Sequence, residues 1–213
     1  TVAEIASFLV GYFCLLFSIS VHESAHAAMA DRCGDSTARW LGRITLNPLR
    51  HIDPIGTVLM PLLMRFTGIP FLFGWAKPVP FNPRNLRNIQ RDPVLIALAG
   101  PASNLLIAFL FVFIARFSGV LVNVGLIPGL PTLVELLLLN MIAINMVLAV
   151  FNLLPVPPLD GHHVLYYFLP DGGQRVLDMI GPYGILIAVV VFSPILNTLF
   201  SPVLNAILLF AGF

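Results

Sequence analysis

Long runs of apolar residues dominate the chain, and four of them are long enough to cross a bilayer as helices. A bilayer core about 30 Å thick requires about 20 apolar residues per helix. The four runs contain few charges and cover approximately residues 3–30, 93–117, 132–154 and 179–200. We therefore expect a membrane-spanning helix at each position. The first run is too long and too poor in basic residues for a removable signal peptide, so we expect it in the mature protein.

Two further apolar segments are less regular. Residues 55–75 are long enough to cross but are interrupted by prolines and glycines and carry Arg65. This pattern predicts a re-entrant or broken span, or part of a strand. Residues 202–213 are too short to cross alone and should pack at the interface or extend the preceding helix beyond a break at Pro202. The predicted fold is a mainly α membrane protein, with a single domain over residues 1–213 and about four to six transmembrane helices.

The composition supports this class of protein. Hydrophobic residues make up 58% of the chain and charged residues only 10%, whereas soluble domains contain about 25% charged residues. The 11 basic residues nearly balance the 10 acidic residues, which argues against a nucleic-acid partner. The two cysteines, Cys14 and Cys33, form no metal-finger spacing or disulfide framework, and we interpret them as packing residues.

Basic residues predict the orientation in the membrane. Four arginines follow the first predicted helix, and one lysine with three arginines precedes the helix at 93–117, whereas residues 118–131 carry no charge. The positive-inside rule places both basic segments in the cytoplasm. The first helix then runs from outside to inside. Residues 55–75 must either enter and leave by the same face or cross twice.

The first apolar run contains the motif His22-Glu23-Ser24-Ala25-His26. The i, i+4 spacing places both imidazoles on one helix face, where they can occupy two corners of a tetrahedral zinc site, and the intervening Glu23 can act on a metal-bound water. Ionisable groups in membrane helices are costly and normally mark functional sites. The alternative interpretation is a pair of structural histidines bonded to neighbouring helices.

A candidate third ligand follows the helix predicted at 132–154. The two histidines should lie roughly 8–14 Å inside the cytoplasmic end of their helix, at about 1.5 Å per residue. Asp160 follows a helix that ends on the same side, in a proline-rich segment that cannot continue as regular helix. Irregular backbone at this depth must be buried or line a wet cavity. Asp160 can therefore complete a three-ligand zinc site with water in the fourth position. Its alternative role is that of a turn or capping residue.

These motifs carry a family resemblance. The segments His22–His26 and Asn152–Gly161 resemble the two signatures of the site-2 protease family of intramembrane zinc metalloproteases. Residues Ala99–Asn104 and Gly74–Pro80 resemble further motifs of its compact prokaryotic branch, peptidase family M50. The resemblance covers most of the chain and implies a location in a prokaryotic cytoplasmic membrane. With the orientation above, the active site should lie toward the cytoplasmic side.

The resemblance also implies roles for individual residues. It implies zinc held by His22, His26 and Asp160, with Glu23 as the catalytic acid and base. Asn152 is expected to help hold the scissile carbonyl or its oxyanion. Three protein ligands predict one zinc ion per chain.

The resemblance further implies that residues 36–80 form a small membrane-embedded β element that pairs with an unwound substrate.

His162 and His163 depart from the family pattern, because many relatives continue the Asp-Gly pair with glycine or serine. We expect this pair to face water or to cap a following helix rather than to bind metal. His51 is expected to be structural or to act in gating.

Three asparagines complete the set of polar candidates. Asn140 and Asn145 are expected to hydrogen-bond across helices. Asn104 should do the same or lie near the break at the active site.

The predicted function is intramembrane endoproteolysis of single-pass membrane proteins. Its partners would be a transmembrane substrate protein and the lipid bilayer. The alternatives are a zinc transporter or channel that uses the same ligands, and an inactive scaffold. Glu23 discriminates between them, because hydrolysis requires a general base between the ligands and transport does not. The sequence leaves the substrate and the oligomeric state open.

Overall fold

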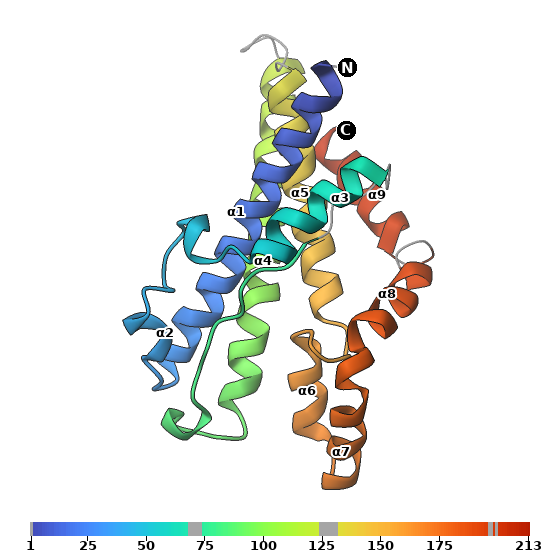
Figure 1. Cartoon of the computed structure of the whole chain (residues 1–213). Coiled ribbons are helices and arrows are strands. Elements are labelled where there is room, and N and C mark those ends of the chain that lie inside the picture. The colour runs from blue at the N-terminus through green and yellow to red at the C-terminus, as the bar shows by residue number, and fades with distance from the viewer. Residues whose placement is uncertain (1, 68–73, 124–131, 196–197, 199) are drawn as a thin grey trace.

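The computed structural model describes residues 2–67, 74–123, 132–195, 198 and 200–213, and the described part is mainly helical (Figure 1). The α-helices are α1 (Val2–Arg32), α2 (Thr37–Trp40), α3 (Met60–Thr67), α4 (Asp92–Asn123), α5 (Thr132–Asn152), α6 (Gly161–Phe168), α7 (Asp171–Ile180), α8 (Gly184–Ile195) and α9 (Ser201–Ala211). Shorter helical segments are η1 (Pro48–Arg50), η2 (Pro54–Leu59), η3 (Pro83–Asn85) and η4 (Gly181–Tyr183).

A bundle of α1, α4 and α5 forms the centre of the molecule. These helices pack against one another along their lengths (Figure 1). Among the described residues, three stretches are helical, long and apolar enough to cross a membrane: Val2–Arg32, Asp92–Gly119 and Thr132–Asn152. The structure therefore confirms long apolar helices at three of the four expected spans.

The fourth expected span, residues 179–200, is not a single continuous helix. Helix α7 ends at Ile180, the 3-10 segment η4 follows, and α8 extends for 12 residues. A proline in η4 explains the interruption, since it lacks the N–H group required by a regular helix. At about 1.5 Å per residue, α8 from Gly184 to Ile195 is roughly 18 Å long. Residues 196, 197 and 199, which follow it, lie outside the described residues. The number of spans beyond three stays a prediction.

Residues 33–91, which we call the connecting layer, join α1 to α4. The described residues of this layer contain no strand, so the β element expected over 36–80 is not shown, and residues 68–73 lie outside the described residues. The local sequence explains the helical turns. In Asn47-Pro48, Asp53-Pro54 and Asn82-Pro83, the first side chain accepts first-turn N–H groups, and the proline occupies the first helical position.

The segment expected to be re-entrant returns to its starting point. The N–H of Trp75 donates to the carbonyl of Gly56 at 3.3 Å, and the Thr57 hydroxyl donates to the carbonyl of Trp75 at 2.7 Å. Lys77 then donates its N–H to the carbonyl of His51 at 2.9 Å. The two ends of 55–75 thus lie side by side, as both a re-entrant segment and a double crossing require, whereas a single crossing would separate them.

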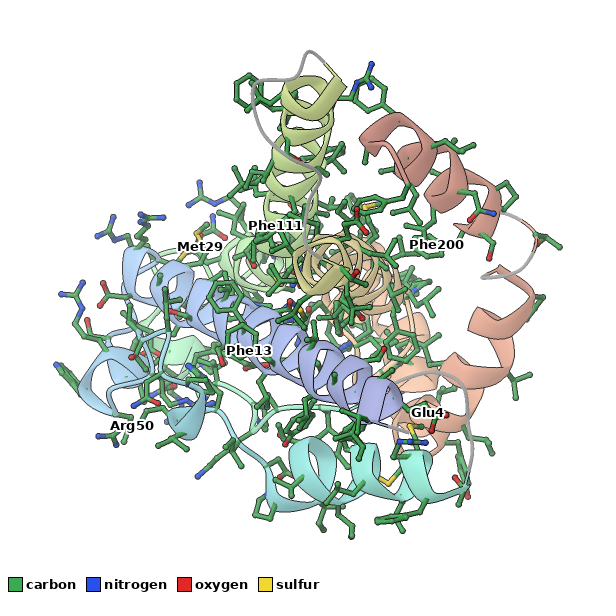
Figure 2. All side chains as sticks on the ribbon, turned by 90° about the horizontal axis from the view of Figure 1, so that it is seen from above. Glu4, Phe13, Met29, Arg50, Phe111 and Phe200 are labelled. Carbon is green, nitrogen blue, oxygen red and sulfur yellow. The ribbon has the colours of Figure 1, made fainter. Side chains whose placement is uncertain are left out.

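The outer surface of the bundle is apolar. On α4, Leu106 is 71% exposed, Phe113 68% and Phe117 64%, as expected of a helix facing lipid. Seen along the bundle, side chains converge between the central helices, while Arg50 of the connecting layer lies at the edge (Figure 2). The largest buried apolar cluster joins α4, α5 and α9, and includes Ala108, Val112, Leu138, Ile142, Met146, Phe200 and Ala211.

Candidate metal centre

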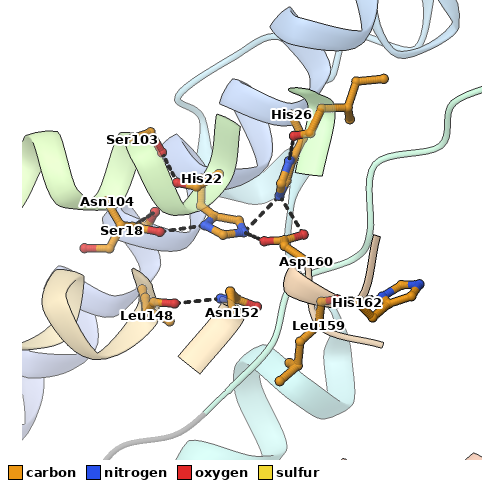
Figure 3. Close-up of polar contacts among 12 residues, drawn as sticks. Ser18, His22, His26, Ser103, Asn104, Leu148, Asn152, Leu159, Asp160 and His162 are labelled. Carbon is orange, nitrogen blue, oxygen red and sulfur yellow. Dashed lines mark hydrogen bonds and ion pairs between the residues drawn. The ribbon is translucent and has the colours of Figure 1, made fainter. Parts of the chain in front are cut away.

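His22, His26 and Asp160 come together inside the bundle (Figure 3). The Nε2 atom of His22 lies 3.1 Å from Oδ2 of Asp160, and Nε2 of His26 lies 3.3 Å from Oδ1. The two Nε2 atoms are 3.0 Å apart. Among the described residues, this is the one group of three or more His, Cys, Asp or Glu side chains arranged to hold a metal ion.

The backbone after α5 carries Asp160 back toward α1. Two turns follow the helix, in which Val156 donates its N–H to the carbonyl of Leu154 and Leu159 donates to that of Val156. Helix α6 then begins at Gly161. A Cβ atom at Gly161 would lie 2.2 Å from the carbonyl oxygen of Leu153, so only glycine allows α6 to start this close to the end of α5.

The hydrogen bonds of the two rings determine where their lone pairs point. His26 donates through Nδ1 to the carbonyl of Ile96 at 2.7 Å, because a carbonyl can only accept. Nδ1 of His22 lies 2.6 Å from Oδ1 of Asn104. In neutral rings with a hydrogen on Nδ1, both Nε2 atoms present lone pairs to each other and to Asp160.

This donor set fits a metal cation. The converging nitrogen and oxygen atoms are all acceptors, and the buried Oδ2 of Asp160 has no hydrogen-bond donor within the described part of the chain. Either extra protons or a cation must offset their repulsion. Two imidazole nitrogens and one carboxylate oxygen are a typical ligand set of catalytic zinc sites, which keep a further position open.

Gly100 of α4 forms the wall behind the two rings. A Cβ atom at this position would lie 2.4 Å from Nε2 of His26 and 2.6 Å from Cε1 of His22. Any side chain would therefore occupy the space of the imidazoles. The sequence pattern indicated that residues 99–104 belong near the site, but it did not reveal that Gly100 contacts both ligands or that the carbonyl of Ile96 orients one of them.

Glu23 is half-buried on α1, between the two histidines in sequence. Its carboxylate makes no hydrogen bond or ion pair with the described residues, so it is available to a substrate or water. Its charge is close enough to influence Arg43 and His51 of the connecting layer.

His51 is buried and bonded to the backbone of the connecting layer. Burial lowers the pKa of its ring, and the neighbouring Arg43 charge lowers it further against the opposing effects of the Thr45 carbonyl and Glu23, so His51 is neutral at pH 7. Its Nε2 donates to the carbonyl of Thr45 at 2.9 Å. The ring thus holds the irregular backbone of the layer.

The remaining candidates lie outside the described cluster. Asn152, at the end of α5, donates through Nδ2 to the carbonyl of Leu148 at 3.0 Å (Figure 3). His162 bonds through Nδ1 to the carbonyl of Leu159 at 2.6 Å, and its ring packs on that of His163, with centroids 3.9 Å apart. Neither histidine belongs to the metal-binding group of the described residues.

Comparison with known proteins decides the family. The model of peptidase family M50 matches residues 10–196. The chain belongs to peptidase family M50. It is accordingly a membrane-embedded metallopeptidase of the site-2 protease type, and zinc is the metal implied by its relatives.

Curated relatives of this M50 protease carry the name "Putative zinc metalloprotease". YwhC of Bacillus subtilis is 36% identical over 90% of this chain and 84% of its own length. Rip2 of Mycolicibacterium smegmatis is 33% identical over 90% of this chain and 71% of its own length. Rip2 of Mycobacterium tuberculosis is 32% identical over 85% of this chain and 66% of its own length. No solved structure matches this chain significantly.

Proposed function

We propose that this M50 protease cleaves transmembrane segments of single-pass membrane proteins within the bilayer. The observation that carries the proposal is the cluster of His22, His26 and Asp160, which lies inside a bundle of apolar helices. These three residues would hold one zinc ion per chain. A buried site in such a bundle suits a substrate that is itself a membrane helix.

Glu23 would transfer the protons of the reaction. A bound zinc ion would polarise the scissile carbonyl and lower the pKa of a water molecule. Glu23 would accept a proton from the attacking water and deliver it to the leaving amine. Asn152 uses one N–H of its side-chain amide for Leu148. Its second N–H can serve the developing oxyanion.

Substrate recognition would use residues 74–80, which are neither helix nor strand in the structure. The backbone N–H groups of Trp75 and Lys77 are bonded to the chain at Gly56 and His51, which holds one side of this segment in place and leaves the carbonyl of Ala76 on the other side for a substrate strand. A membrane helix must unwind before it is cut, and replacement hydrogen bonds to such a segment would ease the opening. Glycine, proline or asparagine near the cut should therefore raise the cleavage rate in a model substrate, and equal rates after replacement by leucine would contradict strand pairing.

The active site would face the cytoplasmic side of a prokaryotic cytoplasmic membrane. Arg39 pairs with Asp31, and the backbone of Arg87 bonds to Cys33, so both basic segments reach the end of α1 that carries the metal centre, as the positive-inside rule would require. Arg65 instead pairs with Glu4 at the other end of α1. Single cysteines in place of the exposed Arg50 and Arg84 should react with an impermeant reagent only from the cytoplasmic side. Reaction from opposite sides would mean that 55–75 crosses the membrane once.

The decisive experiment combines zinc analysis with cleavage of a transmembrane peptide in vesicles. His22→Ala and Asp160→Ala should lose the metal, whereas Glu23→Gln should keep zinc and abolish cleavage, because the amide preserves the shape but cannot accept a proton. Glu135→Gln, at an exposed site on α5, is the matched control and should cleave normally.

Cleavage retained in Glu23→Gln would contradict the mechanism. Zinc transport across the vesicle membrane by that variant would instead support the alternative of a zinc transporter or channel.

A further inference from the structure

We infer that Asn104 is a positioning residue that determines which nitrogen of His22 faces the metal, and that Asn145 and Ser18 hold Asn104 in place. The inference rests on the proposed zinc site. It concerns a chain of hydrogen bonds that crosses all three helices of the bundle. Figure 3 shows the part of this chain formed by Ser18, Asn104 and His22.

The orientation of the chain begins at a backbone carbonyl of α5. Nδ2 of Asn145 donates to the carbonyl of Met141 at 2.8 Å and to the hydroxyl oxygen of Ser18 at 2.8 Å. Because a backbone carbonyl can only accept, the amide nitrogen must face Met141. Oδ1 of Asn145 is then directed toward α4.

Asn104 transmits this orientation to α1. Its Nδ2 donates to Oδ1 of Asn145 at 2.8 Å and lies 3.4 Å from the carbonyl of Ser18. Its Oδ1 therefore faces Nδ1 of His22 at 2.6 Å. An amide oxygen can only accept, so Nδ1 of His22 must carry the hydrogen, and its Nε2 presents a lone pair toward Asp160.

Burial makes this orientation persistent. Ser18, Asn104 and Asn145 are each 0% exposed, so water cannot replace a lost partner. A ring with its hydrogen on Nε2 could not bind metal through that atom. Outer hydrogen bonds of this kind fix the ring and its tautomer before the metal arrives.

The two histidines differ in the group that holds the hydrogen on Nδ1. His26 donates to the backbone carbonyl of Ile96, an acceptor that no side-chain substitution removes. His22 depends on the side chain of Asn104. Substitution at Asn104 should therefore affect one ligand selectively.

The test is zinc affinity, measured by chelator competition on the purified full chain. Asn104→Leu should weaken zinc binding by about 10–100-fold, and Asn145→Leu by less, because its effect passes through Asn104. Asn140→Leu is the matched control. Asn140 lies on α5, like Asn145, but its side chain bonds to the carbonyl of Leu136 within its own helix. Its replacement should therefore leave zinc affinity unchanged.

A second measurement excludes a merely structural role. Nitrogen-15 NMR of the metal-free protein should show hydrogen on Nδ1 of His22 in the wild type and a mixture of tautomers in Asn104→Leu. Asn104→Asp, which keeps an acceptor toward the ring, should restore most of the affinity and the tautomer. It also provides the comparison if the leucine variant does not fold.

The outcomes distinguish the role of Asn104 from the existence of the zinc site. Wild-type affinity and an unchanged tautomer in Asn104→Leu, or an aspartate variant as weak as the leucine variant, would overturn the role of Asn104 while leaving the zinc site standing. A wild-type protein that binds no zinc would overturn the proposed function itself.

Discussion

Buried polar side chains of the central bundle bond to one another and to the metal ligands as well as to the backbone, whereas those of the connecting layer bond mainly to the backbone. In the bundle, Asn104 and Asn145 bond to each other, and Asn104 bonds to His22. In the layer, buried Asp35 accepts from the backbone N–H groups of Thr37 at 3.2 Å and Asn82 at 2.7 Å. Arg43, His51 and Thr57 likewise donate to backbone carbonyls.

The difference follows from the state of the backbone. A helix satisfies most of its own N–H and C=O groups, so polar side chains between helices keep atoms available to one another and to a metal, even where one atom bonds to a carbonyl, as in Asn145 and His26. An irregular chain leaves these groups unpaired, and buried side chains must bond to them. A metal centre can therefore form where the backbone is already satisfied. The polar side chains of the layer are occupied in maintaining its shape.

The strongest disruption of the bundle should come from Gly100→Ala. The added Cβ would collide with both imidazoles, so zinc affinity should fall by more than about 100-fold, at the upper end of the effects of ligand-shell changes. Gly119→Ala on the same helix is the control, because a Cβ there meets no atom of the described residues within 4 Å. This control should bind zinc normally and stabilise the helix by up to about 1 kcal/mol. Equal zinc binding by the two variants, measured by chelator competition, would show that Gly100 does not shape the site.

The connecting layer should respond in stability rather than in metal binding. Asp35→Ala removes a carboxylate that also accepts from the Thr37 hydroxyl at 2.6 Å and the Asn85 amide at 2.8 Å. We expect the free energy of unfolding in detergent to fall by about 1.5–3 kcal/mol, while zinc affinity stays unchanged. Asp178→Ala, at an exposed position of α7, should change stability by less than about 0.5 kcal/mol. Zinc loss in Asp35→Ala would mean that the two regions are not separable.

A smaller effect should appear in the pH dependence of the stability that Asp35 contributes. Burial raises the pKa of the Asp35 carboxyl, but hydrogen bonds from Asn85, Thr37 and Asn82 outweigh it, so the folded-state pKa lies below 3.8. A lowered pKa contributes stability above the unfolded-state value, and this contribution is lost as the pH falls through the folded-state value. The melting-temperature difference between metal-free wild type and Asp35→Asn should therefore narrow below pH 3.8. A constant difference from about pH 6 to pH 3 would contradict the charge-dependent role.

The sequence of the connecting layer contains local signals that predict short helical turns. Each Asn-Pro or Asp-Pro pair there combines a capping side chain with a proline that suits the first helical position. The structure places a helical turn at Asn47-Pro48, Asp53-Pro54 and Asn82-Pro83. The family resemblance suggested a small β element over residues 36–80, which the described residues do not show.

The sequence by itself determined the long helices and the pairing of His22 with His26. Apolar length is a property of the local chain, and an i, i+4 spacing places two side chains on one face wherever that helix lies. The sequence also predicts that Asp160 joins these rings, from its depth and from the family resemblance. Only the tertiary structure decided that Gly100 packs against the rings and that Asn104 orients one of them. Residues 82 positions apart, such as His22 and Asn104, meet only when packing has set the rotation and depth of each helix. Hydropathy carries no information on that rotation, because apolar residues surround almost the whole circumference of these helices.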